Sequence, residues 1–296
     1  MSLPGLELAC VLLILGTARA QIPIQCGSPA HVESGECCPP FWGDGSPCGS
    51  VSGRGRCQDI TRETPQERGE REREQRNSRD FRLWWPTFFF RQLCVCRGNF
   101  GGADCGECAY GWQGAGCQAR RVVTRRDIST LSEVERERFV RLLTQSKVIL
   151  SQRYVIYASG SSAPNSPLAF RRASVYDVAN WVHYVSAKSI RTSAEPYYGH
   201  RSAAFPSWHR MYLLHLETEI RNLTGDDAFT MPVWSWAGKA GCDVCTERLF
   251  GSSQGGGQLS GRFGSWQVRE CRPMGPFWGV GEGCVASGYF GNDKVG

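Results

Sequence analysis

The chain has 296 residues, enough for one sizeable hydrophobic core and a small second module. Its fifteen cysteines are too many for an ordinary cytosolic enzyme and indicate an oxidising compartment. The net charge of +6 comes from an arginine-rich chain whose basic residues are interleaved with Asp and Glu, and this mixture argues against a nucleic-acid partner.

The first segment, residues 1–20, reads as a secretory signal peptide. An apolar run precedes small residues at Ala18 and Ala20, the pattern of a cleavage site. Removal of this segment takes Cys10 with it and leaves an even number of cysteines, which allows full pairing. Asn222 lies in the sequon of the chain and is a predicted glycosylation site. No later apolar run approaches the roughly 18 residues of a membrane span.

Residues 21–118 are predicted to form a disulfide-rich module. This part holds ten cysteines and many glycines, with little helical periodicity. Modules of this kind are stapled by disulfides because their core is too small to suffice. The insert from Glu63 to Asp80 has no apolar face and is predicted to be a charged loop. An EGF-like spacing is seen in Cys94, Cys96, Cys105, Cys108 and Cys117.

Residues 119–296 change to longer segments with helical periodicity. Ser132 opens a capping box, and the apolar stripe behind it predicts a helix to about Ser151. A second helix is predicted from Val175 to about Lys188, apolar nearly all round, as a buried bundle helix should be.

Three segments of this second part are predicted to lack helix. Residues 158–171 are rich in Ser, Pro and Gly and read as a loop. Residues 229–236 read as an extended aromatic turn. Beyond Phe250 the chain is Gly-rich and is predicted to be loop-like.

A third helix is predicted after Pro206. Proline suits the first helical position because its missing N–H would be unsatisfied there anyway. From it a helix can run to about Leu223 and stop near Gly225. His209 then faces inward from this helix, while His200 approaches from the preceding loop.

Three histidines, His183, His200 and His209, can therefore converge from two helices and a loop. A single histidine is more often a core or surface residue than a ligand, but three convergent imidazoles form a metal site. Neutral imidazoles suit copper or zinc, and each needs an acceptor that fixes its tautomer. Glu217 or Asp177 could be that acceptor, and a capping or salt-bridge role is equally open for either.

The remaining candidate metal ligands, a fourth histidine and two cysteine pairs, are predicted to have other roles. His215 follows His209 by six residues, about 240° round the helix, so it is predicted to face the surface and to stay out of the same site. Two Cys-x2-Cys pairs could form a zinc ribbon, but an oxidising compartment favours disulfides. These pairs are Cys105 with Cys108 and Cys242 with Cys245.

The stretch around the third helix resembles the copper-A signature of the tyrosinase family. It reads His200-x4-Phe205-Pro206-x-Trp208-His209-Arg210-x2-Leu213-x3-Glu217. Other matching segments are Glu36-Cys37-Cys38-Pro39-Pro40, Ser52 to Cys57, Tyr176-Asp177, Trp181-x-His183-Tyr184 and Cys242-Asp243-Val244-Cys245-Thr246. The resemblance covers nearly the whole chain. Residues 43–48 and 222–230 favour the vertebrate-type members.

This resemblance implies a mainly α fold. The expected architecture is a type-3 copper four-helix bundle over 119–296, preceded by the disulfide-rich, EGF-like module over 21–118. His183, His200 and His209 match the copper-A ligands. The disulfides implied by the resemblance are Cys26–Cys37, Cys38–Cys57, Cys48–Cys94, Cys96–Cys105, Cys108–Cys117, Cys242–Cys245 and Cys271–Cys284.

The activity that the resemblance implies is the one that starts melanin synthesis. Complete members hydroxylate monophenols such as tyrosine to o-diphenols such as DOPA, and oxidise these to o-quinones with O₂ and two copper ions. They are expected in the melanosome membrane, with related family members as possible partners.

The sequence departs from the family after the third helix. No histidine follows His215, so the three copper-B histidines are absent from these 296 residues, as is the family's membrane anchor. We therefore expect a copper-A half-site, a partial bundle, at most one copper ion and no oxidase activity, in a lumenal or secreted chain. Ser202-Ala203 and Ser235 are smaller departures from the family pattern.

Two other functions remain open at this point. One is a tyrosinase-related isomerase or tautomerase that carries zinc. The other is a non-enzymatic secreted module that acts through its Cys-rich, EGF-like part.

Overall fold

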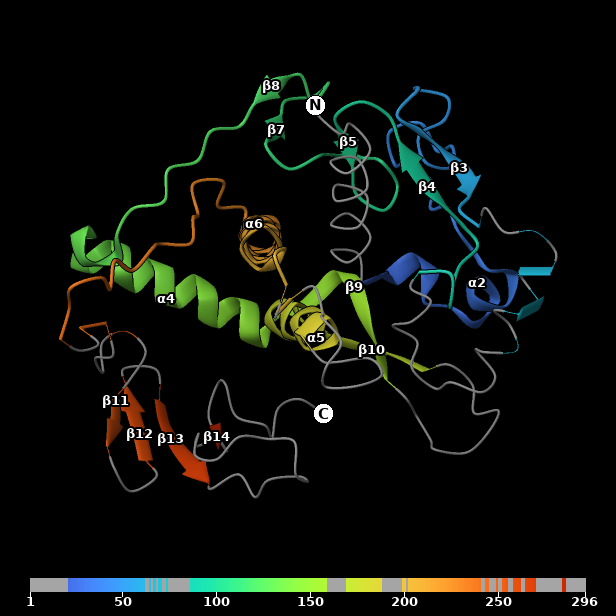
Figure 1. Cartoon of the computed structure of the whole chain (residues 1–296). Coiled ribbons are helices and arrows are strands. Elements are labelled where there is room, and N and C mark those ends of the chain that lie inside the picture. Colours follow the sequence, from blue (N-terminus) through green and yellow to red (C-terminus); the bar gives the residue numbers. More distant parts are fainter. Residues whose placement is uncertain are drawn as a thin grey trace, which may run out of the picture. The chain divides into compact units, whose positions relative to one another are not determined.

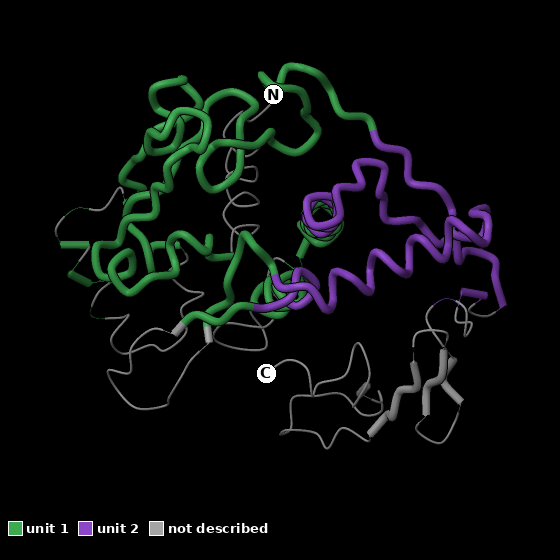
Figure 2. Tube along the Cα trace, turned by 180° about the vertical axis from the view of Figure 1, so that it is seen from behind, with its two compact units in different colours: residues 1–122, 151–172, 178–215 green, residues 123–150, 173–177, 216–296 purple. Residues whose placement is uncertain are grey.

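A computed structural model provides the fold, with helices and several small sheets (Figure 1). The residues that it describes are 21–61, 64, 66–67, 69–70, 73, 86–158, 169–187, 199–200, 202–240, 243–244 and 249, and the strand residues 252–254, 258–261, 264–269 and 284–285. The chain divides into two compact units (Figure 2). Unit 1 comprises 1–122, 151–172 and 178–215, and unit 2 comprises 123–150, 173–177 and 216–296.

Unit 1 begins with short elements whose ends follow from local sequence. Strand β1 (Ile22–Pro23), the 3₁₀ helix η1 (Ile24–Cys26) and helix α2 (Pro29–Ser34) come first. Ser28 caps α2 by accepting from the His31 N–H, and Gly35 ends it with a φ of 68°, which suits glycine. A three-stranded sheet of order β2-β4-β3 follows, made of Glu36–Cys37, Gln92–Cys96 and Gly55–Asp59.

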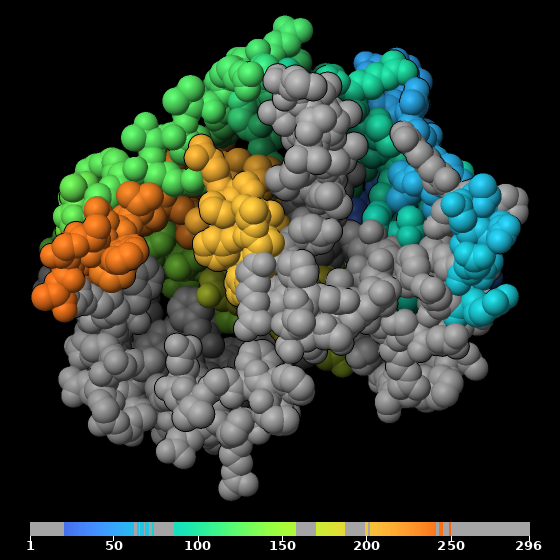
Figure 3. All heavy atoms as spheres, viewed as in Figure 1, coloured from blue at the N-terminus to red at the C-terminus, as the bar shows by residue number. Residues whose placement is uncertain are grey.

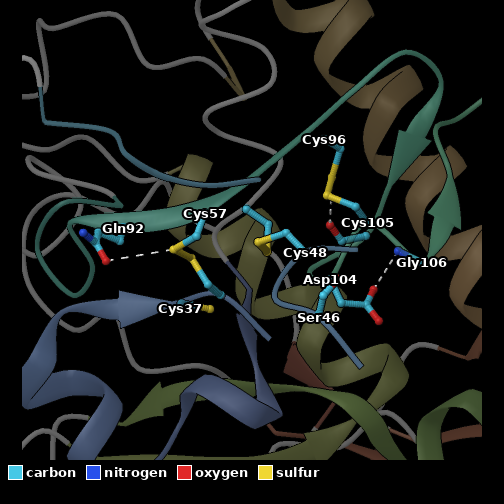
Figure 4. Close-up of a disulfide and its surroundings, with 12 residues drawn as sticks. Cys37, Ser46, Cys48, Cys57, Gln92, Cys96, Asp104, Cys105 and Gly106 are labelled. Carbon is cyan, nitrogen blue, oxygen red and sulfur yellow. Dashed lines mark hydrogen bonds between the residues drawn. A yellow bond between two sulfur atoms is a disulfide. The ribbon is translucent and has the colours of Figure 1, made fainter. Parts of the chain in front are cut away.

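Five disulfides replace much of the missing apolar core in this part of unit 1. They are Cys26–Cys37, Cys38–Cys57, Cys48–Cys94, Cys96–Cys105 and Cys108–Cys117, which confirms five of the expected pairs. Figure 4 shows the Cys96–Cys105 bond and, beside it, Asp104 accepting from the Gly106 N–H at 2.9 Å. Because Cys105 and Cys108 are both oxidised, the zinc-ribbon alternative is wrong for them. The pairs Cys242–Cys245 and Cys271–Cys284 rest on residues outside the described part.

Two small antiparallel sheets complete the Cys-rich part. Strands β5 (Phe100–Gly101) and β6 (Glu107–Cys108) form one, and β7 (Trp112–Gln113) and β8 (Ala119–Arg120) the other. The guanidinium of Arg120 lies 3.9 Å from the centroid of the Trp112 ring. The EGF-like assignment stays a prediction, and most of the charged insert from Glu63 to Asp80 lies outside the described residues.

A second sheet corrects the predicted loop between the first two long helices. Strand β9 (Leu150–Ala158) pairs with β1 on one side and with β10 (Ala169–Ser174) on the other, in the order β1-β9-β10. Ile22 pairs with Val155, and these two residues are 0% and 5% exposed. The predicted loop over 158–171 is therefore wrong at its ends, because pairing within this sheet outweighs the local Ser/Pro/Gly signal.

The long helices follow the sequence closely. Helix α4 (Glu133–Val148) begins at the expected capping box between Ser132 and Glu135. Helix α5 covers Val175–Ala187, and helix α6 covers Phe205–Thr224 and ends at Gly225, whose φ is 68°. None of the described helices is both long and apolar enough to cross a membrane.

Unit 2 packs around α4 and the second half of α6. The rings of Phe139 and Phe229 stack with centroids 6.1 Å apart, and both are buried. Residues 229–236 run without regular structure, as expected, apart from a bridge between Val233 and Asp127.

The C-terminal part is not purely loop-like, which corrects that prediction. Strands β11 (Ser252–Gln254), β12 (Gln258–Gly261), β13 (Gly264–Arg269) and β14 (Cys284–Val285) form an antiparallel sheet. Together with the sheets of unit 1, these strands make the mainly α expectation only partly correct.

Unit 2 also buries charged groups that form ion pairs. Glu217 is 0% exposed and accepts from Arg125 Nε at 3.1 Å, from the Met231 N–H at 2.9 Å and from Arg221 Nη2. Lys147 and Asp177 form a second buried ion pair. A buried charge is tolerated only with such partners.

We predict that Glu217→Gln lowers the free energy of unfolding by about 3–5 kcal/mol, because it leaves the buried guanidinium of Arg221 without its counter-charge. Urea denaturation measures this loss. Lys239→Ala is the matched control, since Lys239 and Asp243 form a partly exposed pair and its loss should barely move the midpoint. Equal effects of the two substitutions would contradict the assigned role of Glu217.

Candidate metal centre

The structure brings His183, His200 and His209 together within unit 1. His183 lies on α5, His209 on the first half of α6, and His200 on the segment before α6. One ring nitrogen from each lies within 4.8 Å of the others. The ring centroids are 5.2 Å apart for His183 and His200, and 5.5 Å apart for each of the other two pairs.

The orientation of His209 follows from its place on the helix. Its Nδ1 lies 2.9 Å from the carbonyl oxygen of Phe205, one turn earlier. A carbonyl only accepts, so Nδ1 carries the proton and donates it, and Nε2 keeps its lone pair. A backbone acceptor of this kind fixes the tautomer and ring orientation of a metal-binding histidine. The suggested acceptors Glu217 and Asp177 instead form the ion pairs described above, which favours the salt-bridge alternative.

An aromatic wall supports the cluster. Trp208 is 3% exposed and stacks on Tyr212 with ring centroids 5.4 Å apart. Both rings contact His183, at centroid distances of 5.7 and 5.5 Å. This wall shields one side of the cluster from water and limits the movement of the His183 ring.

The surroundings of His183 favour its neutral form. Burial lowers the pKa of His183 below its ordinary value, and the neighbouring His200 and His209 lower it further by charge repulsion. A metal ion needs the neutral form of histidine, so this environment leaves a lone pair ready to bind. Among the described residues the cluster consists of three imidazoles, a donor set that suits copper or zinc and disfavours calcium or magnesium.

An exposed aromatic ring lies beside the cluster. The Phe205 ring lies 4.3 Å from the His209 ring by centroid, and Phe205 is 46% exposed. Part of α6, yellow to orange, reaches the molecular surface in the space-filling view (Figure 3).

His215 is not a surface residue, and that prediction is wrong. It is 5% exposed, and both ring nitrogens have protein partners: Nδ1 lies 2.7 Å from the Tyr110 hydroxyl, and Nε2 contacts the Gln21 amide. The predicted exclusion of His215 from the three-histidine cluster agrees with the structure. The angle between His209 and His215 along the helix predicted correctly that they lie on different sides of α6. It could not predict that Gln21 and Tyr110 cover the side with His215.

Comparison with known proteins gives the family. A family model described as the common central domain of tyrosinase matches residues 173–295. Tyrosinase of Bos taurus is 38% identical over 277 residues, 88% of this chain and 51% of that protein. Tyrosinase of Pelodiscus sinensis is 39% identical over 259 residues, 83% of this chain and 92% of that relative.

The chain belongs to the tyrosinase family. The human protein named 5,6-dihydroxyindole-2-carboxylic acid oxidase is also similar, with 38% identity over 272 residues. The chain spans about half the length of most of the curated tyrosinases that it matches. The donor set of the three histidines suits copper or zinc.

The predicted glycosylation site lies in the last turn of α6. Asn222 is exposed, as a modified side chain must be, and the Thr224 hydroxyl of its sequon donates to the Ile220 carbonyl at 2.7 Å. Modification of Asn222 remains a prediction.

We predict that His215 makes this protein sensitive to acid. Burial lowers the His215 pKa from 6.5 to about 3, so the folded state keeps the ring neutral while the unfolded state takes up a proton below about pH 6.5. Stability is therefore lost as the pH falls through this range, by about 2 kcal/mol at about pH 5.

Urea denaturation at about pH 7.5 and about pH 5 tests this effect in wild type and His215→Gln. Glutamine keeps a polar side chain but does not titrate, so the variant should lose about 2 kcal/mol less than wild type between the two pH values. An identical pH dependence in the two proteins would refute the assignment.

Proposed function

We propose that this chain holds one copper ion through His183, His200 and His209, as the copper-A half of a tyrosinase-type oxidoreductase. The observation that carries the proposal is the convergence of three imidazole nitrogens within 4.8 Å, in a chain of this family. His209 contributes Nε2, because its Nδ1 donates to the Phe205 carbonyl. The protein orients these rings, through the Phe205 carbonyl for His209 and through the Trp208 and Tyr212 rings for His183.

The proposed activity of the complete protein is the hydroxylation of monophenols and the oxidation of o-diphenols to o-quinones with O₂, in melanin synthesis. Copper supplies the redox chemistry of those reactions, and two ions are needed for the two electrons that O₂ takes up. The present 296 residues contain no histidine after His215, so they provide ligands for one such site. We therefore propose metal binding without oxidase turnover for this chain by itself.

The surroundings of the cluster suit a phenol. The exposed ring of Phe205 beside His209 offers an apolar face against which an aromatic substrate can pack. The buried Trp208 ring closes the opposite side. The proposed organisation is a signal peptide over 1–20, a Cys-rich, EGF-like module over 21–118 and the copper-binding domain over 119–296, with entry into the secretory pathway and a melanosomal destination for the complete protein.

Metal titration tests the proposed copper site. We expect the purified chain to bind one Cu²⁺ per molecule, with nitrogen hyperfine structure in its electron paramagnetic resonance spectrum. The triple variant His183→Gln, His200→Gln and His209→Gln should lose this ion, because each change removes a donor.

His31→Gln is the matched control, since His31 lies on α2 outside the cluster and should leave binding intact. A triple variant that binds copper as tightly as wild type would refute the site. Preference for Zn²⁺ in competition would instead support the zinc-dependent isomerase or tautomerase alternative.

Oxidation of L-DOPA separates the half-site from a complete oxidase. The copper-loaded chain is expected to form dopachrome no faster than the triple variant, as followed by absorbance. Turnover well above that of the variant would show that the chain completes its own centre, for example by pairing with a second copy.

A further inference from the structure

A second histidine environment in unit 1 lies outside the metal cluster. His215 on α6 contacts Gln21, Tyr110 and the ring of Tyr154, whose centroid lies 6.0 Å from the imidazole centroid. Arg153 is the charged group that acts on it. All five residues belong to unit 1.

The hydrogen bonds of His215 fix its tautomer. The partner of its Nε2 is the side-chain amide nitrogen of Gln21, which can only donate, so Nε2 accepts. The ring is neutral, so its one proton is on Nδ1 and is donated to the Tyr110 hydroxyl oxygen at 2.7 Å. Gln21 therefore supplies a donor to a buried acceptor, Nε2 of His215.

Gln21 occupies a particular place in the chain. It directly follows Ala20, the last residue of the predicted signal peptide, and would be the first residue after cleavage. It is 7% exposed although it lies at that boundary. The backbone directly after Gln21 is fixed in a sheet, because Ile22 pairs with Val155 in the β1–β9 ladder.

We propose that Gln21 is the amino-terminal residue of the processed chain and a modification site controlled by folding: docked on His215 it remains glutamine, and undocked it cyclises to pyroglutamate. In the cyclisation, the free α-amino nitrogen attacks the side-chain Cδ. The N–Cδ bond forms, the Cδ–Nε2 bond breaks, and Nε2 leaves as ammonia with a proton from the α-nitrogen. No oxidant or other co-reactant is required.

Docking opposes this reaction in two ways. The amide must leave its hydrogen bond with His215 before Cδ can be reached from the α-nitrogen. Cyclisation also destroys the donor, which leaves Nε2 of His215 buried without its partner, an unfavourable state. The inference does not depend on copper, since His215 is not part of the metal cluster.

Mass spectrometry of the full chain, produced with residues 1–20 in a secretory host, tests the proposal. The amino-terminal peptide of the secreted, folded protein is expected to begin at Gln21 and to keep its side-chain amide. A chain that begins at another residue, or folded protein that has already lost one ammonia from Gln21, would overturn the proposal.

The matched variants are His215→Leu and Tyr110→Phe, followed during incubation of the purified proteins. His215→Leu removes the acceptor, and its Gln21 should cyclise about tenfold faster than in wild type, the factor expected for losing one hydrogen bond. Tyr110→Phe removes a hydroxyl but keeps the Gln21–His215 bond, so it should match wild type. Equal rates in His215→Leu and wild type would overturn the proposal.

A second measurement covers the case in which His215→Leu does not fold. Wild-type chain held unfolded in urea should cyclise at least about tenfold faster than the folded chain, because no hydrogen bond then holds the amide. Equal rates in the folded and unfolded chain would show that docking on His215 does not control Gln21.

Discussion

The fixed geometry of helix α6 is the constraint on which the described chemistry depends. An α-helix sets neighbouring side chains about 100° and about 1.5 Å apart along its axis, so His209 and His215 on the unit 1 part of α6 have fixed relative positions. His209 lies in the three-histidine cluster, and His215 contacts Gln21 and Tyr110. Both are held by residues far away in the sequence, so this part of α6 cannot turn without breaking these interactions.

The Cys-rich part of unit 1 has a structural role beyond that of a spacer. Its disulfides hold short strands that could not bury enough apolar surface unaided. From this frame Tyr110 reaches the buried His215, and Arg153 of β9 pairs with Glu107 of β6. The module is thereby connected to the same helix that carries His209, within unit 1.

The ends of the long helices and the three-histidine cluster could be predicted from the sequence, because they depend on local residue patterns. The capping box at Ser132, the proline start of α6 and its glycine stop depend on residues a few positions apart, and the three-histidine convergence follows from two such helices. The five disulfides came from family resemblance. Strand β9 and the partners of His215 were missed because they depend on contacts with residues far away in sequence, 194 positions in the case of Gln21. Helical periodicity predicts on which side of a helix a residue lies, but it does not predict which residues pack against that side.

Hydrogen bonding to the ring nitrogens gives different chemistry to two histidines on the same helix. His215 has both nitrogens engaged by protein groups, Gln21 and Tyr110, so no lone pair is left for a metal and the ring serves packing. His209 donates its Nδ1 proton to the carbonyl of Phe205 in its own helix, and one of its ring nitrogens lies within 4.8 Å of ring nitrogens of His183 and His200. The decisive quantity is how many lone pairs the protein leaves unoccupied, and of these two histidines that number favours His209 as the candidate ligand.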